Sequence, residues 1–206
     1  MNIIEKMHKK YIYGRRINIL AKSLSVLLLE KEQVLDVGSG DGLLAKRIMQ
    51  DRGDVQIHGL DILWRDQTHI PVKLFDGNCI PYDDRSVDVV MLVDVLHHTK
   101  DPIMLLKESK RVARRAIILK DHICDGFLAI PVLKFMDSVG NERHGVTLPY
   151  NYWSSQQWYD TFDELALSVS VWKTDLSLYP TPISWIFDRS LHFIARLECP
   201  NEQTAV

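Results

Sequence analysis

Residues 34–44 read VLDVGSGDGLL, and this stretch decides the fold of the chain. Its first four residues form a short apolar run with the length and β-branching of a buried strand. The run ends at glycines in alternate positions, Gly38, Gly40 and Gly42, and apolar residues from Leu43 onward recur at helical spacing. A strand, a glycine turn and a helix in this order predict a ligand site, because missing side chains let a ligand approach free backbone amides at the helix N-terminus.

The glycine spacing distinguishes between two nucleotide ligands. The dinucleotide fingerprint is G-x-G-x-x-G, with an acid about 20 residues later. Here the last glycine comes one position early, Leu43 stands where the fingerprint requires glycine, and Asp36 lies two residues before the first glycine. The pattern D-x-G-x-G-x-G resembles motif I of the class I S-adenosylmethionine (SAM) dependent methyltransferases. The resemblance implies that Asp36 serves the ammonium group of SAM, directly or through water, and that a loop wraps the methionine part of the cofactor. The loop residues are Gly38, Ser39, Gly40 and Gly42.

Length and composition are those of one globular domain. The chain has 206 residues, of which 46% are hydrophobic and 25% are charged. With a formal net charge of −2, the chain has no overall positive potential that would attract nucleic acid. No stretch reaches the ~18 uninterrupted apolar residues of a membrane-spanning helix, so we expect no stable membrane insertion. Cys79, Cys124 and Cys199 lack CxxC spacing, which predicts reduced thiols, a cytoplasmic location and no metal site.

An acid closes the second expected strand, over residues 54–61. The paired oxygens of the Asp61 carboxylate can accept hydrogen bonds from two adjacent ribose hydroxyls. The family carries Asp or Glu at this position for that purpose. The resemblance also implies that the next residue, Ile62, packs on the adenine face. A helix N-cap is the alternative role for Asp61.

Within residues 72–78, VKLFDGN, a third strand is expected that ends at Asp76. The run FDGNCIPYDDRSVDVV, residues 75–90, resembles the family signature in which an acid and the next residues meet the adenine. The resemblance implies that Asp76 accepts from the adenine amino group. The backbone of Gly77 or Asn78 would then contact the ring edge.

The fourth expected strand, residues 86–93, is almost continuously apolar, as a strand buried on both faces should be. Asp94, His97 and His98 follow at its carboxyl end, where ligands bind in open α/β sheets. We therefore assign Asp94 to the cofactor. Family members often carry one or two histidines here, and His97 or His98 is a candidate base, substrate ligand or helix cap. A purely structural histidine is the alternative.

The fifth expected strand, residues 116–122, follows a helix that starts at Asp101. Asp121 and His122 emerge at its ligand end. Asp121 can hold His122 in one tautomer while His122 takes a proton from a substrate, so His122 is the predicted base. An ordinary turn at this edge is the alternative.

Two segments flank this core. Residues 3–30 predict an amphipathic helix or a broken pair, and the N-terminal segment 1–30 often covers the cofactor in the family. Residues 123–155 combine an apolar helix with an aromatic, polar loop, which suits a cap that recognises a small molecule, although its aromatics can equally fill the core. The N-terminal candidates for the SAM carboxylate are Tyr11, Tyr13 and Arg15 or Arg16. The candidate acceptor contacts are Asn141, Arg143, His144, Tyr150, Tyr152 and Trp153.

The order of elements predicts a single α/β domain over residues 1–206. We expect a Rossmann-like, doubly wound, seven-stranded and mostly parallel sheet in a three-layer αβα arrangement. In the family, the last strand is antiparallel and inserted between the fifth and sixth strands. The chain most resembles the ubiquinone/menaquinone-methyltransferase-like group, which implies methyl transfer from SAM to a small-molecule acceptor, with lipid- or quinone-like molecules included. A non-catalytic SAM-binding scaffold and an NAD-type oxidoreductase are the alternatives, and the residues leave the oligomeric state open.

Overall fold

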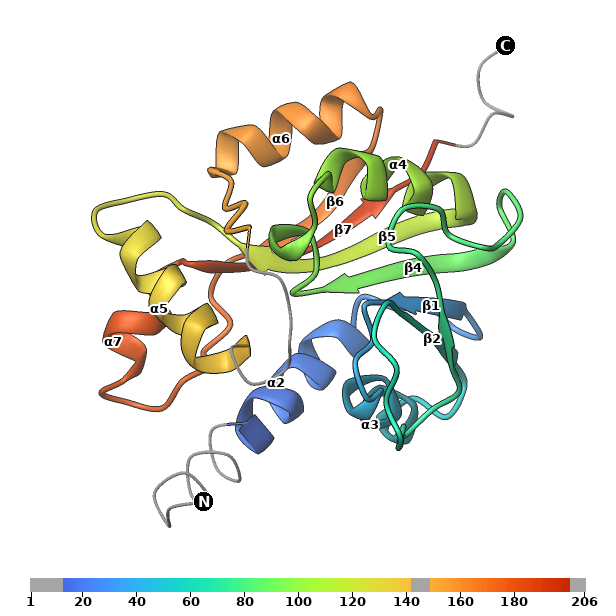
Figure 1. Ribbon diagram of the computed structural model, residues 1–206, viewed down its shortest axis with the longest axis horizontal. Coiled ribbons are helices and arrows are strands. Elements are labelled where there is room, and N and C mark those ends of the chain that lie inside the picture. The colour runs from blue at the N-terminus through green and yellow to red at the C-terminus, as the bar shows by residue number, and fades with distance from the viewer. Residues whose placement is uncertain (1–12, 142–148, 201–206) are drawn as a thin grey trace.

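A seven-stranded sheet in the order β3-β2-β1-β4-β5-β7-β6 organises the molecule. Figure 1 shows it in the computed structural model, which describes residues 13–141 and 149–200. In chain order, the elements are α2 (Gly14–Ser25), β1 (Gln33–Val37), α3 (Leu43–Asp51), β2 (Gln56–Asp61), β3 (Val72–Leu74), β4 (Val87–Val93), the short 3-10 helix η2 (Leu96–His98), α4 (Pro102–Val112), β5 (Ala113–His122), α5 (Ala129–Asn141), α6 (Ser155–Glu164), β6 (Ser168–Lys173), α7 (Ser184–Phe187) and β7 (His192–Glu198).

The strand order reverses at the centre of the sheet. β1 pairs in parallel with both β2 and β4, and Val34 lies opposite Ile57 on one side and Val89 on the other. β7 runs antiparallel to both of its neighbours, β5 and β6. The predicted fold class is therefore confirmed, including the antiparallel last strand between the fifth and sixth strands.

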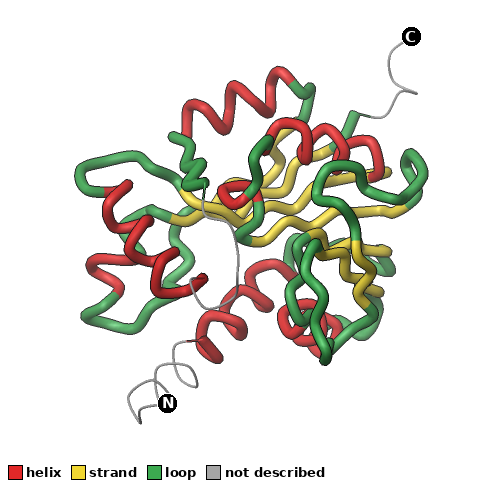
Figure 2. The backbone as a smooth tube through the Cα atoms, viewed as in Figure 1, coloured by secondary structure: helices red, strands yellow, loops and turns green. Residues whose placement is uncertain are grey.

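Helices cover both faces of the sheet, as Figures 1 and 2 show. On one face, α4 and α6 bury Leu106 and Phe162 against the strands. On the other face, α2 and α3 bury Leu24 and Ile48. Each such side chain stabilises the fold by about 1.5–3 kcal/mol relative to an exposed one. These two apolar clusters make the three-layer αβα arrangement.

The start of α4 lies where the sequence places it, and α6 also begins at a local cap. Asp101 caps α4 by accepting a hydrogen bond from the Met104 amide at 2.9 Å. Ser154 caps α6 and forms a reciprocal capping box with Gln157. Caps are local in sequence, so their side chains identify a helix start without knowledge of the tertiary fold.

The third strand is shorter than expected, because a turn follows β3. The Asp76 Oδ1 atom accepts from the amides of Asn78 and Cys79 at 2.8 and 2.9 Å. Gly77 has a φ of +83°, which an extended strand does not allow. The strand therefore ends at Leu74, two residues before the predicted end at Asp76.

The N-terminal helix begins at Gly14 in the described chain and buries Leu20 and Leu24. Tyr13 precedes it and is exposed, whereas residues 3–12 of the expected helix lie outside the described residues. Within the described residues, no helix combines the length and the apolar content that crossing a bilayer requires.

Candidate functional site

The loop between β1 and α3 requires glycine at two positions. Gly38 and Gly42 have φ values of +77° and +74°, in the left-handed region. A Cβ atom at Gly38 would lie 2.4 Å from Val95 Cγ2, and one at Gly42 would lie 2.4 Å from Ile70 Cγ1. The missing side chains therefore let the loop pack against the segments that follow β4 and precede β3.

The amides of this loop are not free, contrary to our expectation. Gly38 donates to the Leu60 carbonyl at 2.7 Å, and Ser39 donates to the same oxygen at 3.2 Å. The Gly40 amide donates to Asp61 Oδ2 at 2.7 Å. The loop is thus fixed to the end of β2 before any ligand arrives. The Ser39 Oγ atom is buried and has no hydrogen-bond partner among the described residues.

Asp36 is an isolated carboxyl group beneath this loop. It is only 3% exposed, and no described residue forms a hydrogen bond with its side chain. Burial, and then the charge of Asp61, raise the pKa of Asp36 to about 7. An unpaired buried carboxylate is costly unless a cation or donor reaches it. The ammonium group that the resemblance places here fits this requirement.

The residues expected around ribose and adenine lie together after β2 and β3. The Asp61 Oδ1 atom accepts from the Leu63 amide at 2.8 Å. Ile62 is 59% exposed, and a Cβ at Gly77 would lie 3.2 Å from Ile62 Cγ2. Asp76 and Asn78 are exposed beside Gly77, and backbone hydrogen bonds lower the pKa of Asp76. An acid and an exposed apolar side chain thus stand next to a turn, which fits a nucleoside.

Asp94 forms ion pairs instead of standing free for a ligand. Its Oδ2 atom lies 2.5 Å from an Arg16 guanidinium nitrogen, and its Oδ1 atom contacts the buried Lys120 ammonium. Burial would raise the pKa of Asp94, but Arg16 and Lys120 outweigh it and hold the pKa below its usual range. Arg16, a candidate for the SAM carboxylate, is thereby engaged, and Arg15 donates to the Ser177 carbonyl. The result is a link between α2 and the ends of β4 and β5.

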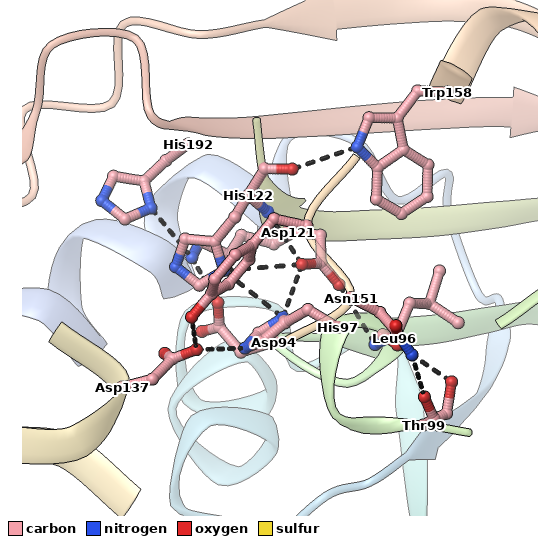
Figure 3. Close-up of polar contacts among 12 residues, drawn as sticks. Asp94, Leu96, His97, Thr99, Asp121, His122, Asp137, Asn151, Trp158 and His192 are labelled. Carbon is pink, nitrogen blue, oxygen red and sulfur yellow. Dashed lines mark hydrogen bonds and ion pairs between the residues drawn. The ribbon is translucent and has the colours of Figure 1, made fainter. Parts of the chain in front are cut away.

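A buried His–Asp pair lies at the carboxyl ends of β4 and β5 (Figure 3). His97 Nδ1 is 2.6 Å from Asp121 Oδ1, and both side chains are buried. The carboxylate also accepts from the amides of Leu96 at 3.1 Å and His122 at 2.8 Å. The sequence predicts His122 as the partner of Asp121. The His122 ring is farther away than that of His97, with Nδ1 3.5 Å from Asp121 Oδ1. Adjacent strand residues point to opposite faces, so Asp121 meets the histidine of the neighbouring turn instead.

His97 carries its proton between two carboxylates. Burial would lower its pKa, but Asp121 and Asp137 outweigh burial and raise the pKa to about 10. On the far side of the ring, Nε2 lies 3.6 Å from Asp137 Oδ2. At neutral pH, His97 is therefore an imidazolium.

The neighbouring histidines are neutral. Burial, then the charges of Lys120 and His97, lower the pKa of His122 well below its usual value. Burial and the His97 charge lower the pKa of His98 to about 4. A neutral imidazole can accept a proton or bind a metal ion.

Described residues of the segment 123–155, which the sequence predicts as a cap, contact this cluster. Asp137 reaches it from α5, and the Tyr152 hydroxyl donates to Asp137. The Asn151 amide donates to the His97 carbonyl at 3.2 Å, and its side chain donates to the Thr99 carbonyl at 2.6 Å. These contacts join the cap to the turn after β4.

Of the other candidate acceptor contacts, the structure describes the side chains of Trp153 and Tyr150. Trp153 packs in the core, with its ring 4.6 Å from that of Trp158, as the core-filling alternative expects. Tyr150 lies next to Lys134, whose Nζ is 5.4 Å from the ring centroid. The side chain of Asn141 is not described, and Arg143, His144 and Tyr11 lie outside the described residues.

The sequence missed three charged or polar residues of this region, Lys120, Asp137 and His192. Lys120 Nζ is 3.3 Å from His192 Nδ1, and both side chains are buried. A lysine at the end of an apolar strand was the available signal for Lys120. Asp137 and His192 reach the cluster only through tertiary contacts, so no local pattern indicates them.

Replacing Asp36 with asparagine is expected to change how stability depends on pH. The folded chain holds the Asp36 proton with a pKa of about 7, whereas an unfolded chain holds it with a pKa of about 3.9. This group therefore favours the folded state at low pH, and its contribution is lost as pH rises through about 7. We expect Asp36→Asn to stabilise the chain by about 2–3 kcal/mol more near pH 8 than near pH 5 in thermal unfolding. A difference between the two proteins that stays the same at both pH values would contradict this.

Comparison with known proteins finds a family model that matches part of the chain. The profile of the methyltransferase domain matches residues 35–119, from β1 into β5. This range contains the expected cofactor residues from Asp36 to Asp94, but not the N-terminal candidates for the SAM carboxylate. No curated protein matches the chain.

Solved structures share the fold at low sequence identity. The methyltransferase in a complex with the Trm112 methyltransferase activator of Haloferax volcanii has a TM-score of 0.70 and 17% identity, with 95% of this chain and 94% of that chain covered. A SAM-dependent methyltransferase from Aquifex aeolicus has a TM-score of 0.61 and 17% identity, with 90% and 93% covered. Geranyl diphosphate methyltransferase in complex with SAM has a TM-score of 0.67 and 12% identity, with 89% and 85% covered.

Proposed function

We propose that this chain is a SAM-dependent methyltransferase and that it acts on a small-molecule acceptor, bound where the cap meets the carboxyl ends of β4 and β5. The observation that carries the proposal is the buried His97–Asp121 pair, which Asp137 and Tyr152 of the cap enclose. A group that reaches this pair has to enter beneath the cap. An enclosed polar cluster of this kind suits a small molecule better than a protein surface or a nucleic acid.

We assign the cofactor contacts as the sequence predicted them, with one change. Asp36 takes the ammonium group, and Asp61 takes the ribose hydroxyls. The glycine loop supplies close backbone approach for the methionine part, and residues 76–78 with Ile62 take the adenine. Asp94 acts indirectly, because its carboxylate is used by Arg16 and Lys120. When bound, SAM supplies a methyl group that is electrophilic because it is attached to a sulfonium.

The residues of this chain then have to place a nucleophile in line with that methyl group. Positioning alone can lower such a barrier by roughly 7–11 kcal/mol. We propose that Asp121 orients His97 toward the acceptor and that His122 takes the acceptor proton. A base is needed only where the acceptor is a hydroxyl or an activated carbon, which must lose a proton. The buried side chains around this site keep water away from the reacting atoms.

A lipid- or quinone-like acceptor is the finer form of this proposal. The cap and the neighbouring α7 expose large apolar side chains that an apolar tail could cover. They are Phe127, Leu128, Ile130, Phe135, Trp185 and Ile186. Single exposed apolar residues are ordinary, but a group of them beside a candidate site supports an apolar ligand. The cytoplasmic location and the division into a core, an N-terminal segment and a cap remain predictions.

The test separates binding from turnover. Calorimetry with SAM and with NAD tests the cofactor, and mass spectrometry of a panel of short-chain and long-chain hydroxyl acceptors tests methyl transfer. SAM uptake without a methylated product on any acceptor would favour a non-catalytic SAM-binding scaffold. NAD uptake without SAM uptake would favour the oxidoreductase, against which the misplaced third glycine argues.

On the true acceptor, we expect His122→Ala to lower kcat by about 10²–10⁴ while SAM affinity stays unchanged. The matched control is His58→Ala, since His58 is an exposed histidine on β2. Unchanged turnover in His122→Ala would remove His122 from the role of base. Loss of SAM binding in the same variant would indicate a structural role instead.

A further inference from the structure

We propose that the cluster beneath the cap binds one divalent metal ion of the first transition row, through His97, His98 and Asp137. Each of these residues offers one ligand atom, and the three atoms lie within 4.8 Å of one another. Cysteine spacing gave no sign of this site, because its ligands come from the turn after β4 and from α5. The proposal goes beyond methyl transfer and does not depend on it.

His97 has the arrangement of a metal-binding histidine. Its Nδ1 atom is paired with Asp121 Oδ1 at 2.6 Å. Histidines that bind metal ions typically donate one ring N–H to a carboxylate, which fixes the ring and leaves the other nitrogen for the ion. The remaining nitrogen, Nε2, belongs to a side chain that is 1% exposed, and it has no hydrogen-bond partner among the described residues. Without a metal ion this nitrogen carries a proton, and Asp137 is too distant to accept a hydrogen bond from it. A metal ion at this position would displace that proton, which is released to water on binding.

Asp137 faces that nitrogen at the spacing of two ligands of one ion. Its Oδ2 atom lies 3.6 Å from His97 Nε2, which is too long for a hydrogen bond. Two ligands on a tetrahedral Zn²⁺, each about 2.0–2.2 Å from the metal, lie about 3.4 Å from each other. Tyr152 donates its hydroxyl hydrogen to Asp137, which would hold the carboxylate in place.

The Nδ1 side of the His97 ring is less suitable for a metal ion. His97, Asp121 and His122 also bring ligand atoms within 4.8 Å. However, the 2.6 Å contact between His97 and Asp121 is a hydrogen bond, with no room for an ion between the two atoms. Asp121 already accepts from two backbone amides, and the buried Lys120 ammonium repels a cation from His122. The ion therefore belongs between His97 and Asp137.

The donor set indicates the class of ion. Two imidazoles and one carboxylate suit Zn²⁺, Fe²⁺ or Co²⁺, whereas Mg²⁺ prefers oxygen ligands. Three protein ligands leave a further coordination position for water or for an acceptor atom. His98 is half-buried beside His97, with ring centroids 3.9 Å apart, so its ring can supply the third ligand from the same turn.

The test uses the full chain after removal of metals with a chelator. Titration with Zn²⁺ by calorimetry should give one ion per chain, and Co²⁺ should give visible absorption bands that Zn²⁺ abolishes. We expect Asp137→Asn and His98→Gln each to weaken Zn²⁺ binding by at least about 30-fold, whereas His58→Gln, the exposed control, binds as the wild type does. Mg²⁺ in large excess should not compete.

Three results would overturn the assignment. They are the absence of saturable Zn²⁺ binding by the wild type, full binding in both ligand variants, and loss of binding in His122→Gln with full binding in Asp137→Asn. The two ligand variants are judged separately. His98 is half-buried, so its replacement should leave the fold intact. Near-UV circular dichroism checks that each variant is folded. SAM affinity is measured in the same samples without metal. Intact SAM binding with failed Zn²⁺ binding would reject the metal site alone.

Discussion

We expect Gly38→Ala to lower the affinity of the protein for SAM by about 100-fold. A Cβ atom at this position would lie 2.4 Å from Val95 Cγ2, in a backbone conformation with φ of +77°. Left-handed backbone costs an L-residue roughly 1–2 kcal/mol, and an extra methyl group in a packed site costs about 1–3 kcal/mol. A sum near 3 kcal/mol corresponds to a factor of about 100 in binding, because the loop must shift from the geometry that receives the cofactor. Isothermal titration with SAM measures the effect.

Two further variants separate this effect from a general loss of stability. Gly53→Ala is the matched control, because no described atom lies within 4 Å of the added Cβ and its φ is ordinary. We expect SAM binding there to equal that of the wild type. Adding Val95→Ala to Gly38→Ala removes the clashing methyl group and should recover part of the affinity. Binding within threefold of the wild type in Gly38→Ala would show that the loop does not set the cofactor geometry.

We expect Asp121→Asn to destabilise the fold by about 3 kcal/mol at neutral pH. The variant leaves the buried His97 imidazolium with Asp137 as its only carboxylate among the described residues, at 3.6 Å. Breaking a buried ion pair by removing one partner typically costs 3–5 kcal/mol, because the other charge stays buried without compensation. For a domain of this size, we expect the thermal midpoint to fall by about 6–12 °C. Differential scanning calorimetry and urea unfolding measure the change.

The double variant identifies the origin of this loss. If the penalty comes from the uncompensated charge of His97, then Asp121→Asn with His97→Gln should be more stable than the sum of the two single effects predicts. Asp160→Asn, on the exposed side of α6, is the control and should change stability by less than about 0.5 kcal/mol. Additive effects in the double variant would mean that Asp121 acts mainly through its bonds to backbone amides.

The fold was accessible from the sequence because its signals are local or periodic. The buried strand at residues 34–37 and the cap at Asp101 each depend on residues close in sequence. The end of β3 was predicted too late. The Asp76 side chain accepts hydrogen bonds from the amides that follow it, and this turn competes with an extended strand. A pattern of apolar residues does not reveal such a turn.

The cofactor residues were easier to predict than the polar cluster. Asp36, Asp61 and Asp76 stand in or after parallel strands, whose carboxyl ends share one edge, so position along the chain already places them together. The partner of Asp121 depends instead on the η2 turn, which carries His97. Asp137 reaches the same place from the cap. Contacts between distant segments of this kind leave no periodic trace in a single sequence.

The place of β7 has a consequence for biosynthesis. This strand lies between β5 and β6, and the sheet gives β6 no other neighbour among the described strands. Because a ribosome delivers the chain from its N-terminus, residues 113–122 and 168–173 emerge before residues 192–198 can join them. Until then, the β5 edge of the nascent chain is unpaired. Other nascent chains can pair with such an edge, and chaperone binding would prevent this. The seven-stranded sheet is complete only after β7 has been synthesised.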